Sequence, residues 1–371
     1  MDFNGARLRL ARVFRGLTQR DLAQEIAASE ATVWQLERGR TPTETLLEAL
    51  GLVLGFEPEF FFEPLGDEFT EGDCNFRRRL TASERLLKRV LARGTLFGAA
   101  IRYLSQALTL PKYNVPDVAV TTPEDIERAA EQCRSAWSLG LGSPVVHMGR
   151  VLEHAGVVVT RLDEASRLDA FSRRGRDGGV SVVVLNTAKG STSRTRFDMA
   201  HELGHLVMHA KQAIALADRE KQADRFASAF LLPRRGFVRD FWAGGKVDWA
   251  NVIALKARWK VSIQAMIYRA YDLDLIDAVE FRRAYKAISV RGWRKHEPEE
   301  PPAEQPELFG NAMKLLWEKK RLGVSDVARA LHWSARTFED VTGVTPERGV
   351  KEGVLELVPI VKRFGGRHQR R

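Results

Sequence analysis

Two histidines and a glutamate lie close together in a proline-free stretch in the middle of the chain. His201 and His205 are four residues apart, and Glu202 follows the first of them. On an α-helix this spacing places both imidazoles on one face, one turn apart, where their nitrogens can bind the same ion. Phe197 and Met208 fall on the same stripe, so we expect this face to point into the protein. Glu202 lies about 100° around the helix from His201, close enough to hold a water on the ion without being a ligand.

The order H-E-x-x-H is typical of zinc peptidases. Zinc lowers the pKa of a bound water to about 7, and the glutamate takes the proton of that water. The alternative is a helix in which two histidines flank a glutamate by chance. The apolar helix face on which the histidines lie and a third candidate ligand downstream favour the interpretation as a metal site. We therefore predict one Zn²⁺ per chain, with His201 and His205 as ligands and Glu202 as the general base.

A catalytic zinc site uses three protein ligands and leaves one position for water. Downstream of His205, residues 218–233 predict a helix on which Glu220 and Asp224 lie one turn apart on the apolar stripe. Two carboxylates placed there repel each other unless a cation or a hydrogen-bond donor lies between them. Zinc on Glu220 and a histidine ring N–H on Asp224 would supply both. The alternative is a solvated helix held by its own ion pairs.

His209 competes for the role of third ligand because it lies one turn beyond His205. Three successive turns of an unbroken helix cannot all reach one ion. We therefore expect His209 to pack beside the ligands or to contact one of them from behind.

Short apolar runs precede the histidine helix and predict the sheet that positions it. Residues 157–160 and 180–185 are rich in valine, and residues 169–172 suggest a strand between them. A sheet in this place has an edge beside the metal. We expect an extended substrate peptide to pair along that edge, near residues 180–185.

The first 64 residues predict a compact run of short helices. Thr18 and Ser29 are good N-caps for two successive helices that only Ala27 and Ala28 separate, which forces a tight helix-turn-helix. Over about residues 5–63 this segment resembles the XRE family of phage-repressor-like DNA-binding domains. The positions that match the family pattern are Gln19, Ala23, Val33, Leu36, Glu37 and Gly39.

The XRE resemblance implies that the second helix of the motif enters the major groove of double-stranded DNA. The residues expected at base edges are Glu30, Ala31 and Gln35, and those expected near phosphates are Gln19, Arg38 and Arg40. Glu30 can accept from cytosine but repels the DNA backbone, and Ala31 offers only a methyl contact. Because the groove-facing residues are not basic, a helical bundle that docks another protein is the alternative. We expect a homodimer whose paired domains read two half-sites.

Composition limits the classes of protein that this chain can be. Its 371 residues leave room for two or three domains, and 44% hydrophobic with 29% charged residues are typical of a globular protein. The net charge of +10 permits nucleic-acid binding but does not show it. No apolar run is long enough to span a membrane, and the chain does not begin like a signal peptide. Two cysteines far from any partner pattern read as reduced, so we expect a cytoplasmic protein.

A wider resemblance is to the ImmA/IrrE family of metallo-endopeptidases, and specifically to its long members with an XRE domain in front. The segments that carry this resemblance are 169–172, 201–205, 220–233, 259–265 and 291–295. The family implies a zincin-like fold with zinc on His201, His205 and Glu220 and with Glu202 as base. It also implies a regulatory role, in which an XRE-type repressor is cleaved. The alternative is a non-catalytic regulator or antitoxin whose zincin-like domain serves as sensor or scaffold.

The predicted fold is a helix-rich α+β protein with four segments. An all-α helix-turn-helix domain covers residues 1–64, a helical connector 65–120, a zincin-like metallopeptidase domain 121–295, and a Pro/Glu linker with C-terminal helices 296–371. The start of the connector, rich in acidic residues, Gly and Pro, reads as a linker. The C-terminal helices carry no recognisable chemistry, and we expect a passive cap more than a dimerisation or sensing module.

Overall fold

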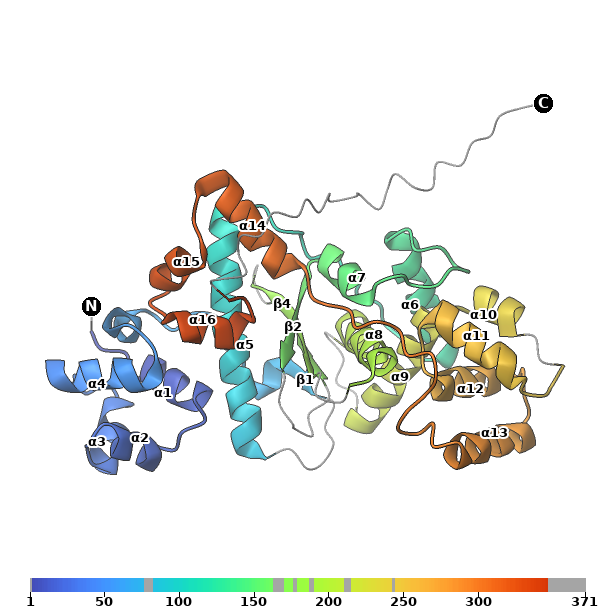
Figure 1. The fold of residues 1–371 in the computed structure, drawn as a ribbon, viewed down its shortest axis with the longest axis horizontal. Helices are drawn as coiled ribbons and strands as arrows, with labels where there is room; N and C mark the ends of the chain where they lie inside the picture. Colours follow the sequence, from blue (N-terminus) through green and yellow to red (C-terminus); the bar gives the residue numbers. More distant parts are fainter. Residues whose placement is uncertain are drawn as a thin grey trace.

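A computed structural model of the chain describes residues 2–76, 83–162, 170–175, 179–186, 190–209, 215–241 and 244–345. Helices surround one small sheet, which confirms the predicted helix-rich α+β class (Figure 1). The first residue of the predicted 169–172 strand and the last part of the predicted C-terminal segment, residues 346–371, lie outside the described residues. Within the described ranges, no helix is both long and apolar enough to cross a membrane.

The N-terminal domain has the predicted run of short helices. They are α1 (Gly5–Phe14), α2 (Gln19–Glu25), α3 (Glu30–Leu36), α4 (Glu44–Leu54) and the 3₁₀ turn η1 (Pro58–Phe62). The Thr18 side chain accepts from the backbone of Asp21, whose carboxylate accepts from the Thr18 N–H in return, so a capping box begins α2. Ser29 is the N-cap of α3, and its side chain accepts from the N–H of Thr32. These caps fix the tight helix-turn-helix that the sequence predicts.

The remaining elements follow in chain order. The middle of the chain contains η2 (Glu71–Asp73), β1 (Cys74–Phe76), α5 (Glu84–Ala107), α6 (Pro123–Ala136), α7 (Met148–His154), β2 (Val157–Leu162), β3 (Ala170–Arg173), β4 (Ser181–Asn186), α8 (Thr192–Met208) and α9 (Leu216–Leu231). The last part contains α10 (Arg234–Phe241), α11 (Trp249–Trp259), α12 (Ile263–Asp272), α13 (Ala278–Val290), α14 (Leu308–Lys320), α15 (Val324–Ala330) and α16 (Ala335–Thr342).

The sheet has the strand order β1-β3-β4-β2, in which β2 runs parallel to β4 and the other pairs are antiparallel. β4 is therefore a central strand, paired on both sides. The expectation that a substrate strand adds near residues 180–185 is wrong, because the backbone groups of β4 already bond to β2 and β3. The edges are formed by β2 and by β1, and β1 directly follows the acidic start of the connector that reads as a linker.

Each face of the sheet contributes to a different hydrophobic core. Val182 and Val184 pack with the N-terminal domain, α5 and the C-terminal helices α14 to α16. Val183 and Leu185 pack with α6 to α9 and the helices that follow them. This alternation is the period of two of a β-strand, and it places the sheet between two helical layers (Figure 1). The C-terminal helices thus share a core with the first domain, although more than two hundred residues separate them in the chain.

An extended, glutamate-rich segment, residues 296–307, crosses the second helical layer before α14 begins; we call it the glutamate strap. Two glutamates of the strap bind the same residue, the fully buried Lys256. The ammonium of Lys256 pairs with Glu297 at 2.8 Å and with Glu300 at 2.7 Å. Glu297 also accepts from the N–H of Ile263 at the start of α12, and Glu300 from the N–H of Ser193 at the start of α8. Carboxylates at helix N-termini are favourable, so this predicted linker is held in place.

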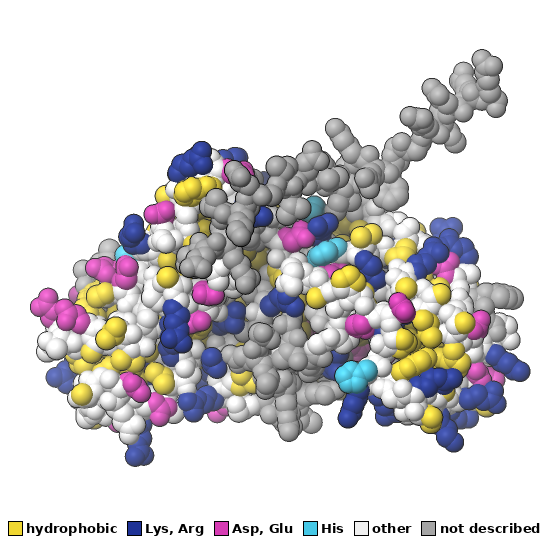
Figure 2. All heavy atoms as spheres, in the orientation of Figure 1, with side chains coloured by type: hydrophobic (Ala, Val, Ile, Leu, Met, Phe, Trp, Pro, Cys, Tyr) yellow, Lys and Arg dark blue, Asp and Glu magenta, His cyan; other side chains and the backbone are white. Residues whose placement is uncertain are grey.

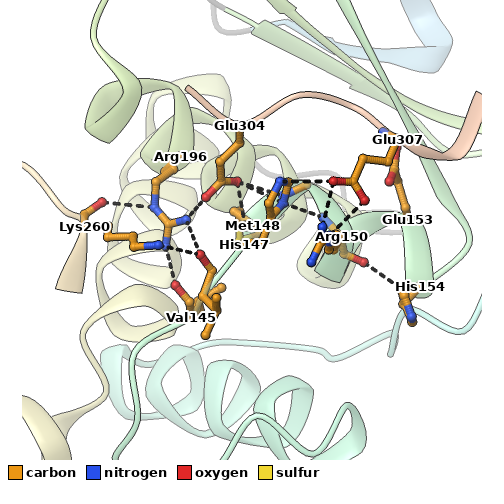
Figure 3. Close-up of polar contacts among 12 residues, drawn as sticks. Val145, His147, Met148, Arg150, Glu153, His154, Arg196, Lys260, Glu304 and Glu307 are labelled. Carbon is orange, nitrogen blue, oxygen red and sulfur yellow. Dashed lines mark hydrogen bonds and ion pairs between the residues drawn. The ribbon is translucent and has the colours of Figure 1, made fainter. Parts of the chain in front are cut away.

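The next anchor of the strap is Glu304, drawn in Figure 3. Its carboxylate pairs with the fully buried guanidinium of Arg196 on α8 and accepts from the N–H groups of Met148 and Gly149 at 2.7 and 3.1 Å. Arg196 in turn donates to the carbonyl of Val145 at 2.6 Å. The strap therefore joins the first turn of α7 to the helix that carries the two histidines.

Replacing Glu304 by alanine should destabilise the protein by about 3 kcal/mol, because the guanidinium of Arg196 would stay buried without its carboxylate. Equilibrium unfolding in denaturant measures this change. Glu299→Ala is the matched control, since Glu299 belongs to the same strap but is exposed. Equal small effects of the two substitutions would show that the Glu304 anchor contributes nothing specific.

Candidate metal centre

Helices α8 and α9 form the candidate site by crossing at close range. Gly204, within the H-E-x-x-H pattern, makes this approach possible: a Cβ at Gly204 would lie 3.1 Å from the ring of Phe226 on α9. Phe226 stacks on Phe230, with ring centroids 5.8 Å apart, and both rings are fully buried. The close contact brings the first turns of α9 over the histidine face of α8.

The three predicted ligands lie together. The Nε2 atoms of His201 and His205 are 3.1 Å apart, and the carboxylate of Glu220 lies 3.4 Å from the first and 3.2 Å from the second. One ligand atom from each residue falls within 4.8 Å of the others. Both histidines are buried and Glu220 is partly buried. Burial raises the pKa of Glu220, but hydrogen bonds with the two imidazoles outweigh it and hold the pKa far below its usual range.

Each of the two histidines is oriented by a hydrogen bond at its Nδ1 atom, on the side of the ring away from Glu220. His201 Nδ1 lies 2.8 Å from the carboxylate of Asp224, as the sequence predicts. His205 Nδ1 lies 2.8 Å from Nδ1 of His209, and His209 Nε2 lies 2.8 Å from the side-chain oxygen of Gln222. His209 therefore contacts a candidate ligand from behind and does not join the cluster. These partners leave both Nε2 atoms facing Glu220, which is the arrangement that metal-binding histidines require.

The His205–His209–Gln222 chain has a consistent proton assignment. Gln222 accepts through its oxygen, so His209 carries its proton on Nε2 and accepts at Nδ1 from the ring of His205. Burial lowers the pKa of His209 to about 4, which keeps this ring neutral at physiological pH. Burial also lowers the pKa of His205, and a neutral imidazole is the form that binds metals. Gln222 was not among the predicted site residues. The only indication in the sequence is that Gln222 lies two residues after Glu220 on the same helix.

Glu202 is the most unusual group of the site. Its side chain is fully buried, and among the described residues neither carboxylate oxygen has a hydrogen-bond partner. Burial raises the pKa of Glu202 to about 7, opposed by the imidazole of His201 and by the nearby hydroxyl of Ser172, which does not meet hydrogen-bond geometry with the carboxylate. A buried carboxylate without donors is costly unless another group occupies the space beside it. Two imidazoles, one carboxylate and this orphaned acid fit a Zn²⁺ ion with a water next to it.

The residues predicted to contact DNA lie on the outside of the N-terminal domain. Glu30, Ala31, Gln35, Arg38 and Arg40 are exposed. Gln35 accepts from the guanidinium of Arg40, while that of Arg38 lies 4.0 Å from the ring centre of Trp34.

Gln19 differs from the other predicted contacts because its amide donates to the carboxylate of Glu37 at 2.7 Å. The same carboxylate pairs with Arg12. On the face seen in Figure 2, basic and acidic side chains are interspersed over this domain, at the left of the view.

The fold and the site together define a helix-turn-helix protein with a metallopeptidase-like domain. Two family models match the chain. The model described as the IrrE N-terminal-like domain, a peptidase family, matches residues 152–271, and a helix-turn-helix domain model matches residues 5–59. The chain thus combines a helix-turn-helix domain with an IrrE/ImmA-like peptidase domain, which confirms both resemblances. No curated protein matches the chain.

Proposed function

We propose that this protein is a transcriptional regulator whose second domain is a zinc-dependent endopeptidase that cleaves an XRE-type repressor or regulator. The observation that carries the proposal is the buried, unpartnered carboxylate of Glu202 beside His201, His205 and Glu220. A site that only held a metal for stability would need the three ligands and would gain nothing from this acid. Removing Glu202 from water is unfavourable, so its place is best explained by chemistry.

His201, His205 and Glu220 would hold the ion, with Asp224 and His209 fixing the two imidazoles. When bound, zinc supplies a Lewis acid that polarises the scissile carbonyl and lowers the pKa of a water. Glu202, with a pKa raised to about 7, is matched to take a proton from the attacking water and to return it to the leaving amine. The burial of Glu202 and of the two imidazoles shields these groups from bulk water during this exchange.

Specificity would come from co-localisation. A peptidase joined to a DNA-binding domain can meet its substrate on shared DNA, and short tethers raise the local concentration to about millimolar. The test is incubation of the zinc-loaded protein with candidate regulators, those encoded beside its gene included, and with casein. The proposal requires cleavage of one regulator at a single site and little digestion of casein. Broad digestion of unfolded proteins would instead indicate a housekeeping protease.

The second candidate function is a non-catalytic regulator or antitoxin in which the peptidase-like domain is a sensor or scaffold. The helix-turn-helix match supports a regulator in either case. The burial of Glu202 favours the catalytic proposal, and homodimer formation remains a prediction.

The DNA contacts lead to a prediction about two neighbouring side chains. Gln35→Ala should relax sequence preference by about 1–3 kcal/mol at one base pair, whereas Arg38→Ala should weaken all sequences alike and reduce the salt slope by about 1. Fluorescence anisotropy with duplexes over a range of salt measures both effects. Arg282→Ala removes the same charge from α13 and is the control. Binding to every duplex that is equal and insensitive to salt would support the protein-docking alternative.

A further inference from the structure

The C-terminal helices α14 to α16 repeat the layout of α1 to α3. The two segments align without insertion or deletion, and several equivalent residues are identical. The identical pairs are Gly5 with Gly310, Leu10 with Leu315, Leu17 with Leu322, Asp21 with Asp326, Ala23 with Ala328, Ser29 with Ser334, and Thr32 with Thr337. The helix-turn-helix family match covers only the first of these segments.

The backbone of the second segment reproduces the turn of the first. Asp326 caps the start of α15 by accepting from the N–H of Gly323, as Asp21 does at the start of α2. The residue that lets the chain leave each helix has a positive φ, 51° at Ala27 and 57° at His332. A non-glycine residue seldom adopts this conformation, so its recurrence at the equivalent position is a specific likeness.

The turn also closes through equivalent hydrogen bonds. The N–H of Ala28 donates to the carbonyl of Ala23 at 2.8 Å, and that of Trp333 to Ala328 at 2.9 Å.

The burial of α16 follows that of α3. Phe338 and Val341 are buried like Val33 and Leu36. The exposed positions also correspond: Glu30, Ala31, Trp34 and Gln35 on α3 are matched by Ala335, Arg336, Glu339 and Asp340 on α16. By position, α16 is the recognition helix of a second helix-turn-helix unit.

The second unit uses its turn and α16 to contact the first unit. Asp340, at the position of base-facing Gln35, pairs with Arg15 at the end of α1 at 2.7 Å. The N–H of Ser334 donates to the carbonyl of Gly55 at 3.1 Å, and the buried hydroxyl of Thr337 donates to the same carbonyl at 2.5 Å.

A short bridge completes this contact. Phe56 and Trp333, both buried, pair in antiparallel fashion, and the N–H of Glu57 donates to the carbonyl of His332 at 2.9 Å.

The charges on α16 favour its contact with the first unit over DNA binding. Two of the four exposed positions of α16 carry carboxylates, those of Glu339 and Asp340, which repel phosphates. We propose that residues 308–343 are a second helix-turn-helix unit whose recognition helix binds the first helix-turn-helix unit of the same chain instead of DNA. Because the glutamate strap leads directly into α14, this docking links the helix of the candidate metal centre to the DNA-binding domain.

Hydrogen exchange tests the docking without any DNA. In the full-length protein, Asp340→Arg places a second positive charge beside Arg15 and should speed exchange of the Glu57 and Ser334 N–H groups at least tenfold. Thr337→Val removes the bond to Gly55 and should do the same. Glu339→Arg makes the same charge change one residue away and should leave both rates within about twofold of the wild type. Unchanged rates in both docking variants would overturn the proposal.

The opposing possibility is that the second unit reads DNA. It has a basic cluster, since Lys319, Lys320 and Arg321 are exposed at the end of α14, and Figure 2 shows Lys and Arg side chains gathered there. This second experiment rests on the proposed DNA binding of α3. Arg336→Ala and Lys319→Ala should leave the affinity and salt slope of the full-length protein for DNA unchanged, while Arg38→Ala lowers both. A loss of more than threefold in either of the first two variants would overturn the proposal. If the wild type binds no duplex, the DNA-binding function fails, and hydrogen exchange alone decides the docking.

Discussion

Replacing His201 or Glu220 by alanine is expected to abolish zinc binding and the stability that zinc confers. With the three ligands intact, a zinc concentration a hundred times the Kd should stabilise the folded protein by about 2.7 kcal/mol, because the unfolded chain binds the ion poorly. Removal of one ligand leaves two protein donors, one fewer than a catalytic zinc site uses. Thermal unfolding with zinc and with chelator, together with elemental analysis, measures both effects.

Variants of the residues that contact the histidine ligands make this test specific. Asp224→Ala and His209→Ala should keep the ion but lower its affinity about 10- to 100-fold, because these residues orient the ligands without binding the metal. His154→Ala removes an exposed histidine of the same domain and should change nothing. Full occupancy in Glu220→Ala with loss of zinc in His209→Ala would mean that the third ligand is His209.

Glu202→Gln should lower the rate of substrate cleavage by about 10²- to 10⁴-fold while zinc occupancy stays at the wild-type level. The amide fills nearly the same volume but cannot take a proton from water. The same substitution removes a buried carboxylate that makes no hydrogen bond among the described residues, so the metal-free protein should be no less stable than the wild type. Cleavage kinetics on the identified regulator and unfolding in the presence of chelator give the two readouts.

Two results would contradict this role of Glu202. Cleavage at the wild-type rate would exclude it as the general base. A Glu202→Gln strain in which gene regulation is unchanged would instead support the non-catalytic alternative, in which the metal serves only structure.

The candidate centre could be predicted from the sequence because it lies on two regular helices. The period of 3.6 residues places His201 and His205 on one face, and the same period indicates why Glu220 and Asp224 need a partner. Their burial was predicted less well, since the side chain of Asp224 is 49% exposed. Gln222 was missed because a hydrogen bond between helices depends on how they cross, which helical periodicity does not specify.

The larger errors came from segments that look like linkers. β1 follows an acidic stretch and is only three residues long, so alternation could not reveal it. β1 pairs with β3 and forms one edge of the sheet, whereas β4 is central because β2 and β3 flank it, which removes the predicted substrate edge. The glutamate strap has the composition of a flexible linker, yet its carboxylates meet buried cations and helix N-termini contributed by distant parts of the chain. Composition alone cannot report such partners.

The second helix-turn-helix unit was present in the sequence as identical residues at equivalent positions, but comparison of the chain with itself was needed to see it. Phe338 and Glu339 replace the Val33 and Trp34 of the first unit, which changes the family pattern while the turn keeps its geometry.

Zinc binding by His201, His205 and Glu220 is tested most directly by anomalous X-ray scattering at the zinc edge from crystals of the zinc-loaded, full-length protein. One strong peak per chain is expected, within coordination distance of Nε2 of His201, Nε2 of His205 and the carboxylate of Glu220. Glu202 should lie beside this peak without binding the ion. A structure with no peak there would contradict the account, as would a single peak at the other group of potential ligands in the described ranges, Glu57, Glu59 and His332.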